Sequence, residues 1–156
     1  MNLTIGIITV SDTRDTTTDH SGALIKNLAV AAGLQAIGPV IVQDDQTKIR
    51  QAYQTLCQQS VDVIITNGGT GIAKRDVTLE AIQPLMIQEI PGFGEFFRAL
   101  SFADIGTHAM ASRAIAGFDH EDHLLFSLPG STAACQLAME KLILPEIYHL
   151  IKERRK

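Results

Sequence analysis

The chain has 156 residues, of which 46% are hydrophobic and 19% charged, which is typical of one globular domain with a full hydrophobic core. The formal net charge of −4 argues against nucleic acid as a partner, because nucleic acids select basic surfaces. No apolar run approaches the roughly 18 residues that a membrane-spanning helix needs, so we expect no membrane segment.

The first residues enter an apolar run directly, without a basic leader, so we expect no signal peptide. Cys57 and Cys135 are both expected inside helices, where they are most simply reduced, buried thiols of a cytoplasmic protein. We therefore treat residues 1–156 as a single cytoplasmic domain.

Strands and helices alternate along the first part of the chain. Residues 3–10 (LTIGIITV) are typical of a buried strand, and a helix capped by Ser21 and closed by Gly33 should follow. Residues 34–42 predict a second strand. From Ile49 onward, apolar residues recur with the spacing of a helix that buries one face.

The alternation continues to the end of the chain. The β-branched run at 61–65 predicts a third strand, and a helix should begin near Thr78, a plausible N-cap. Residues 91–102 are rich in phenylalanine, residues 124–128 predict another strand, and the last helix should run to about Arg155. This order predicts an α/β fold with a parallel sheet covered by helices on both faces.

Four predicted strands are followed directly by polar or glycine-rich turns. Because ligands of such sheets bind outside the carboxyl ends of the strands, we expect these turns to form one site. Two turns offer carboxylates and two offer backbone N–H groups, which glycines allow to approach a ligand closely. The turns are Ser11-Asp12, Asp44-Asp45, Gly68-Gly69-Thr70-Gly71 and Pro129-Gly130-Ser131.

Two familiar nucleotide-binding motifs are absent. No GxxxxGK[ST] occurs, and no GxGxxG follows the first strand. Carboxylates beside a bound phosphate require a cation, and Mg²⁺ held by one or two carboxylates is the usual solution. Asp44 and Asp76 are the natural metal ligands at this edge, so the pattern favours phosphoryl or nucleotidyl transfer.

Six short segments together resemble the MogA/MoaB family of molybdenum cofactor biosynthesis proteins. Their order along the whole chain makes the resemblance specific, and the segments FFRALSF and IGTHAMASRAIAG are closer to the MoaB branch. The resemblance implies a three-layer α/β/α sandwich whose mostly parallel sheet contains one antiparallel strand. The segments are TVSDTR (9–14), ITNGGTG (65–71), RDVT (75–78), PGFGE (91–95), MASRAIAG (110–117) and LPGS (128–131).

The resemblance also implies a function. Active members of the family bind molybdopterin and adenylylate it with Mg-ATP, giving molybdopterin-AMP and pyrophosphate. The alternative is a non-catalytic molybdopterin-binding or carrier protein of the same pathway. The family forms trimers, or hexamers in the MoaB branch, and a molybdate-inserting enzyme is a candidate partner.

Site residues are implied position by position. Asp44 and Asp76 match catalytic or metal-organising positions, and Ser112 matches a pterin-binding serine, with Arg113 beside it as a candidate phosphate partner. The turns at 11–12, 68–71 and 129–131 match substrate- and nucleotide-binding positions. Gln43 replaces a proline common before the first acidic residue, which leaves the choice between Asp44 and Asp45 open. The retained RDVT aspartate favours activity.

Two segments have competing interpretations. The acidic and histidine-rich segment 119–123 (DHEDH) resembles a metal cluster, but we expect a solvated turn because no matching ligands are evident elsewhere. In residues 91–102, Phe93, Phe97 and Leu100 share one helical face, and Phe96 lies about 100° away. This segment is either a core helix or a subunit interface, where aromatic residues are enriched.

Overall fold

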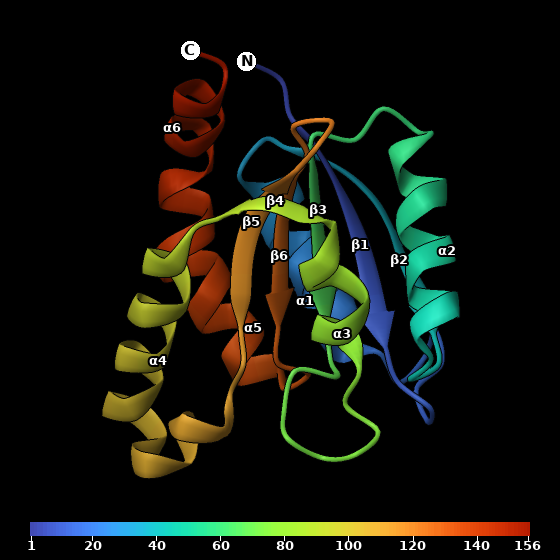
Figure 1. The fold of residues 1–156 in the computed structure, drawn as a ribbon, viewed down its shortest axis with the longest axis vertical. Coiled ribbons are helices and arrows are strands. Elements are labelled where there is room, and N and C mark those ends of the chain that lie inside the picture. Colours follow the sequence, from blue (N-terminus) through green and yellow to red (C-terminus); the bar gives the residue numbers. More distant parts are fainter.

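Six strands form one sheet in the order β2–β1–β3–β6–β5–β4, described for residues 1–156 by a computed structural model (Figure 1). The strands are β1 (Thr4–Val10), β2 (Gln35–Val42), β3 (Val63–Asn67), β4 (Met86–Glu89), β5 (Ile115–Asp119) and β6 (Leu124–Leu128). The helices are α1 (His20–Ala31), α2 (Gln46–Cys57), α3 (Thr78–Ile82), α4 (Pro91–Ile105), α5 (Thr132–Ala138) and α6 (Leu144–Arg154), with short 3₁₀ turns at Gln83–Leu85 and Gly106–Ala111 and a π turn at Met139–Ile143.

One strand of the sheet is reversed. β1 pairs in parallel with β2 and β3, and β3 pairs in parallel with β6. β5 is antiparallel to both of its neighbours, β6 and β4. The expected three-layer fold with a single antiparallel strand is confirmed.

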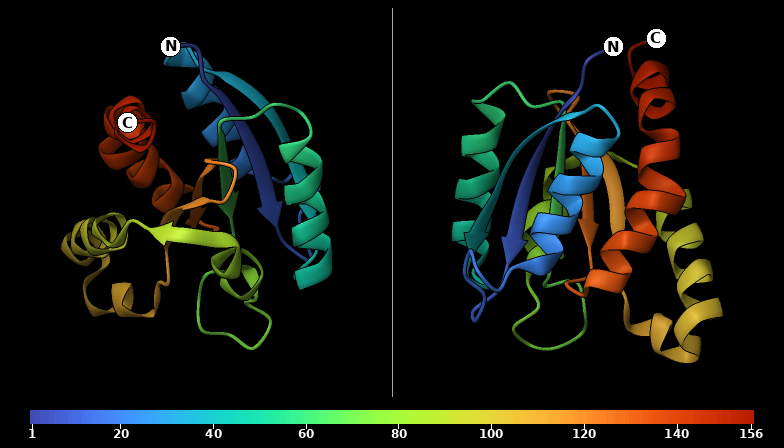
Figure 2. Two further views of the ribbon diagram at one scale, coloured as in Figure 1. Left: turned by 45° about the horizontal axis from the view of Figure 1, so that its top comes forward. Right: turned by 180° about the vertical axis from the view of Figure 1, so that it is seen from behind.

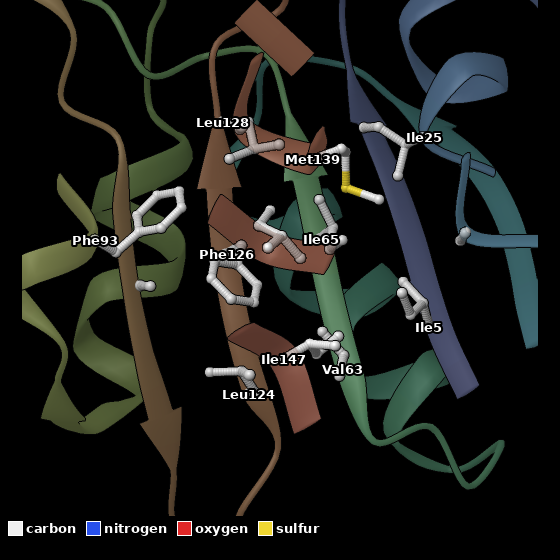
Figure 3. Packing of buried hydrophobic residues seen from close by; sticks show 14 of the residues in the cluster. Ile5, Ile25, Val63, Ile65, Phe93, Leu124, Phe126, Leu128, Met139 and Ile147 are labelled. Atoms are coloured by element: carbon white, nitrogen blue, oxygen red, sulfur yellow. The ribbon is translucent and has the colours of Figure 1, made fainter. Parts of the chain in front are cut away.

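The central strands are buried on both faces, as their apolar runs predict. In β3, for example, Val63 and Ile65 face one cluster of buried side chains and Ile64 faces the other. The larger cluster is covered by α1, α4, α5 and α6, and the smaller one by α2 and α3 (Figure 2). Figure 3 shows Ile25, Met139 and Ile147 packed against the strand side chains of the larger cluster.

Some local expectations are wrong. Asp19, rather than Ser21, caps α1, because its carboxylate accepts the Gly22 N–H at 2.9 Å. Thr78 is the first residue of α3, not its N-cap, since its hydroxyl donates to the Gly68 carbonyl instead. The expected last helix does end as predicted, at Arg154, but it consists of α5 and α6 joined by the π turn at Met139–Ile143.

The turn at 119–123 also differs from the expectation of a solvated loop. Asp119 is fully buried and His123 is 8% exposed, whereas the three residues between them are exposed, as expected of a solvated turn. Cys135 is buried as predicted, and Cys57 is only half-buried. None of the helices is long and apolar enough to cross a membrane.

Candidate functional site

The turns that follow β1, β2, β3 and β6 meet around one polar pocket of about 240 Å³. The pocket lies at the lower edge of the sheet in Figure 1, where these strands end. It is lined by Val10, Ser11, Asp12, Thr13, Arg14, Asp44, Gly69, Arg75, Asp76 and Gly130. The structure therefore brings together Asp44 and Asp76, which are 32 positions apart in the sequence, as predicted for this edge.

Gly68 permits the close approach of two of these turns. It follows β3 directly with a φ of +97°, and a Cβ at this position would lie 2.2 Å from the carbonyl oxygen of Val10. Its N–H donates to the Leu128 carbonyl at 3.0 Å, which ties the turn to the end of β6. Only glycine can combine this backbone conformation with this contact.

Gly69 and Thr78 hold the next part of the turn. Thr78 is fully buried, and its hydroxyl donates to the Gly68 carbonyl at 2.8 Å, while its N–H donates to the Gly69 carbonyl at 3.1 Å. Gly69 has a φ of +71°, and a Cβ there would lie 2.2 Å from the Thr78 hydroxyl. The glycine turn is therefore anchored to the start of α3 before any ligand binds.

Three carboxylates, those of Asp12, Asp44 and Asp76, face the pocket. The backbone N–H of Asp44 donates to Asp12 Oδ1 at 2.9 Å, and Asp76 Oδ2 accepts the Ala73 N–H at 2.9 Å. Burial, followed by the negative charges of Asp12 and Asp76, raises the pKa of Asp44 above its ordinary value. Oxygen donors that repel one another in this way suit a hard divalent cation such as Mg²⁺.

The structure also separates the two adjacent aspartates after β2. Asp45 accepts the Lys48 N–H at 2.9 Å and serves as the N-cap of α2. Asp44 points to the pocket, which makes it the carboxylate available to a metal. The structure therefore favours Asp44 over Asp45 as the site carboxylate, and its role as a metal ligand stays a prediction.

Arg14 and Arg75 provide positive charge in the same pocket, and neither was among the predicted site residues. Arg14 Nη2 donates to the Gly130 carbonyl at 2.8 Å, and its Nη1 lies 3.9 Å from Asp19 Oδ1. Their positions in the sequence could have indicated them, because Arg14 ends the TVSDTR segment and Arg75 opens RDVT. Arginine suits phosphate recognition through its planar fork of donors.

Ser112 and Arg113 lie outside this pocket, in a neighbouring cavity of about 460 Å³. The Arg113 guanidinium bonds the Gly71 carbonyl at 2.8 Å, the Asp76 carbonyl at 3.1 Å and the Glu80 carboxylate at 2.6 Å. Its bond to Glu80 lowers the pKa of that carboxyl. In the structure, Arg113 holds the segment that follows the glycine turn through these hydrogen bonds, and its role as a phosphate partner stays a prediction.

The remaining predicted residues have structural contacts in the same region. The Ser11 hydroxyl accepts the Arg14 N–H at 3.1 Å, and the Ser131 hydroxyl caps α5 by accepting the Ala134 N–H at 3.2 Å. Thr70 is buried, and its carbonyl accepts the Arg113 N–H. Pro129 accepts a bond from the Cys135 thiol through its carbonyl at 3.2 Å. These residues shape the turns, and their contact with a substrate remains a prediction.

The chain is thus a three-layer α/β/α protein whose acidic, glycine-lined pocket lies beyond the carboxyl ends of its parallel strands, where proteins of this class bind their ligands. Residues 6–149 match the family described as "Probable molybdopterin binding domain". Molybdenum cofactor biosynthesis protein B of Staphylococcus carnosus is 53% identical over 154 residues, covering 96% of this chain and 89% of that protein.

Solved structures of related proteins have the same fold as this chain. The crystal structure of a Molybdenum cofactor biosynthesis protein B superposes with a TM-score of 0.93 at 47% identity, covering 100% of this chain and 98% of that chain. The tungsten cofactor synthesizing protein MoaB from Pyrococcus furiosus gives 0.91 at 36% identity, with 99% and 98% covered. The chain belongs to the MogA/MoaB family of molybdenum cofactor biosynthesis proteins.

Proposed function

We propose that this protein binds molybdopterin and adenylylates it with Mg-ATP, giving molybdopterin-AMP and pyrophosphate. The observation that carries the proposal is the placement of Asp44 and Asp76 in one pocket with Gly69 and Gly130. Nucleotidyl transfer requires chiefly positioning and the neutralisation of charge on phosphate groups. The pocket offers carboxylates for a cation and turns for phosphate oxygens.

Each part of the pocket has a defined task in this proposal. Asp44 and Asp76 would hold Mg²⁺, which when bound would supply neutralisation of the negative charge on the phosphates of ATP. Arg14 and Arg75 donate to phosphate oxygens, and the glycine turn brings its backbone to the same pocket at Gly69. The terminal phosphate of molybdopterin attacks the α-phosphate of ATP, and pyrophosphate leaves.

We assign the pterin to the neighbouring cavity that contains Ser112. Arg113 links the two regions, because it lines this cavity and its guanidinium bonds the carbonyl of Asp76, a residue that lines the acidic pocket. A pterin beside Ser112 can therefore extend its phosphate toward Asp76. The cavity volume of about 460 Å³ is within the range of small-ligand sites.

Pyrophosphate release by purified protein tests this function. We expect release only when ATP, Mg²⁺ and molybdopterin are all present. Asp76→Asn should reduce turnover by at least ~100-fold, as loss of a charge-stabilising group does in other enzymes, and should leave pterin affinity unchanged. The matched control is Asp45→Asn, which alters a neighbouring carboxylate that caps α2 instead of facing the pocket. No pyrophosphate with the full mixture would refute the proposal.

The second candidate is a non-catalytic molybdopterin-binding or carrier protein. It is favoured by the Arg113 clamp, which completes the turn without a nucleotide. It predicts that pterin affinity is the same with and without ATP and in Asp44→Asn. Tight ATP binding that changes with this substitution would exclude it.

We also propose that the protein forms a homo-oligomer, a trimer or a hexamer, through exposed apolar side chains on and after α4. Phe93 and Phe97 are core residues, so that part of the competing interpretation is correct. Phe96 and Phe102, however, are 65% and 59% exposed, and Met110 is 82% exposed. Monomeric surfaces rarely leave a group of such large apolar side chains in water.

A further inference from the structure

A second group of reactive side chains lies at the opposite edge of the sheet from the acidic pocket. In Figure 1 the end of α2 and the turn between β5 and β6 are at the top, and the glycine turn is at the bottom. Cys57 is the last residue of α2, Asp119 is the last residue of β5, and His123 lies in the turn directly before β6. One potential ligand atom from each residue lies within 4.8 Å of the other two.

The carboxylate of Asp119 is already held in a fixed orientation. Its Oδ1 accepts the backbone N–H groups of Glu121 and His123, both at 2.9 Å. Its Oδ2 accepts the Tyr53 hydroxyl and contacts His123 Nδ1 at 2.8 Å. Although burial opposes the shift, the bonds from Tyr53 and His123 lower the pKa of Asp119. A buried, ionised carboxylate is therefore aimed at the histidine ring.

The spacing of the three groups is close to that of tetrahedral zinc coordination. His123 Nδ1 lies 2.8 Å from Asp119 Oδ2 and 3.7 Å from Cys57 Sγ. Zinc bonds of ~2.0–2.3 Å at tetrahedral angles separate neighbouring ligand atoms by roughly 3.3–3.6 Å. The nitrogen and oxygen atoms would have to separate by roughly 0.5 Å or somewhat more, and their hydrogen bond would open.

We propose that Cys57, Asp119 and His123 bind a zinc ion. The Cys57 thiol releases its proton to solvent and binds as the thiolate, and His123 binds through Nδ1 with its remaining proton on Nε2. Water would fill the fourth position, and it can reach the site because Cys57 is only half-buried. Tyr53 is a positioning residue, because its hydroxyl orients Asp119 without touching the metal.

The site would join two parts of the chain that are far apart in sequence. Its ligands connect the last residue of α2 to the turn between β5 and β6, so zinc binding would stabilise the native state over the unfolded chain. The site is independent of the proposed adenylylation, since it lies at the other edge of the sheet. A failure of one proposal therefore leaves the other intact.

Titration of the full-length protein with Co²⁺ and Zn²⁺ tests the assignment, with excess Mg²⁺ present to fill the acidic pocket. We expect one Co²⁺ per chain, with the thiolate-to-cobalt charge-transfer band and the intense visible bands of tetrahedral cobalt, and displacement by Zn²⁺. Zinc should also raise Tm. Cys57→Ala should abolish the charge-transfer band and the rise in Tm, and Tyr53→Phe should weaken zinc binding by about 10- to 100-fold.

Two variants serve as controls. Cys135→Ala removes the other thiol, and His120→Ala removes an exposed histidine from the same turn; both should bind zinc as the natural protein does. Circular dichroism confirms that each variant is folded. The proposal is wrong if the natural protein shows no charge-transfer band, or if Cys57→Ala binds zinc with unchanged affinity.

Discussion

The sharpest structural prediction concerns Gly68, which sets the distance between the ends of β1 and β3. In Gly68→Ala the residue must keep a φ of +97°, which costs an L-residue about 1–2 kcal/mol. Its methyl group must also avoid the Val10 carbonyl oxygen, only 2.2 Å away. The turn therefore has to move, and this movement would lengthen or break its hydrogen bonds with the Leu128 carbonyl and the Thr78 hydroxyl.

The magnitude follows from these contacts. Loss of one buried hydrogen bond costs about 1–3 kcal/mol, so with the conformational cost we expect Gly68→Ala to lower the free energy of unfolding by about 2–5 kcal/mol. Gly33→Ala is the matched control. Gly33 has a similar φ of +86°, but nothing lies within 4 Å of its Cβ position. Gly33→Ala should therefore lower the free energy of unfolding only by the conformational cost of about 1–2 kcal/mol.

Urea unfolding followed by circular dichroism measures both variants, with equal m-values as the condition for comparing them. We expect Gly68→Ala to be the less stable variant and to lose pyrophosphate release, whereas Gly33→Ala keeps that activity. Equal losses of stability in the two variants would mean that the close approach of the turns is not enforced by packing, which would refute this reasoning.

Two further predictions concern charge and assembly. Because burial and neighbouring negative charges raise the pKa of Asp44, Mg²⁺ affinity should fall, as pH is lowered, at a higher pH than an ordinary aspartate would require. Asp12→Asn removes one of these charges and should move the fall to lower pH in Mg²⁺ titrations at several pH values. An unmoved profile would contradict the part of the shift that is assigned to Asp12. Phe96→Asp should shift the protein toward monomers in size-exclusion chromatography with light scattering, because the Phe96 side chain is exposed in the single chain and belongs to the proposed interface. The control is Ile72→Asp, which changes another exposed apolar residue, on the glycine loop, and should leave the oligomer unchanged. An unaltered elution of Phe96→Asp would place the interface elsewhere.

The sequence predicted the parts of the fold that depend on local pattern. The apolar runs of β1, β3 and β6 and the glycine at the end of α1 were sufficient, because burial on both faces and a left-handed C′ residue leave clear signals. β4 and β5 were not predicted. β4 is a short edge strand with three exposed residues, and its pairing with β5 depends on partners distant in the sequence.

The sequence predicted only the part of the site that depends on which residues follow the ends of the strands. Asp44 and Asp76 do lie at one edge as predicted, but the different surroundings of Asp44 and Asp45 depend on the geometry of α2, which the sequence does not show. The buried partners of Asp119 were missed for a related reason. Tyr53 and Cys57 lie on one face of α2, and nothing local indicates that the turn at 119–123 packs against that face.

A crystal structure with Mn²⁺ and a non-hydrolysable ATP analogue tests the central claim most directly. Anomalous scattering locates the manganese ion independently of the nucleotide. We expect the ion between the Asp44 and Asp76 carboxylates, with the α-phosphate beside the turns at Gly68–Gly71 and Gly130. Nucleotide and ion bound at any other part of the chain would contradict the account.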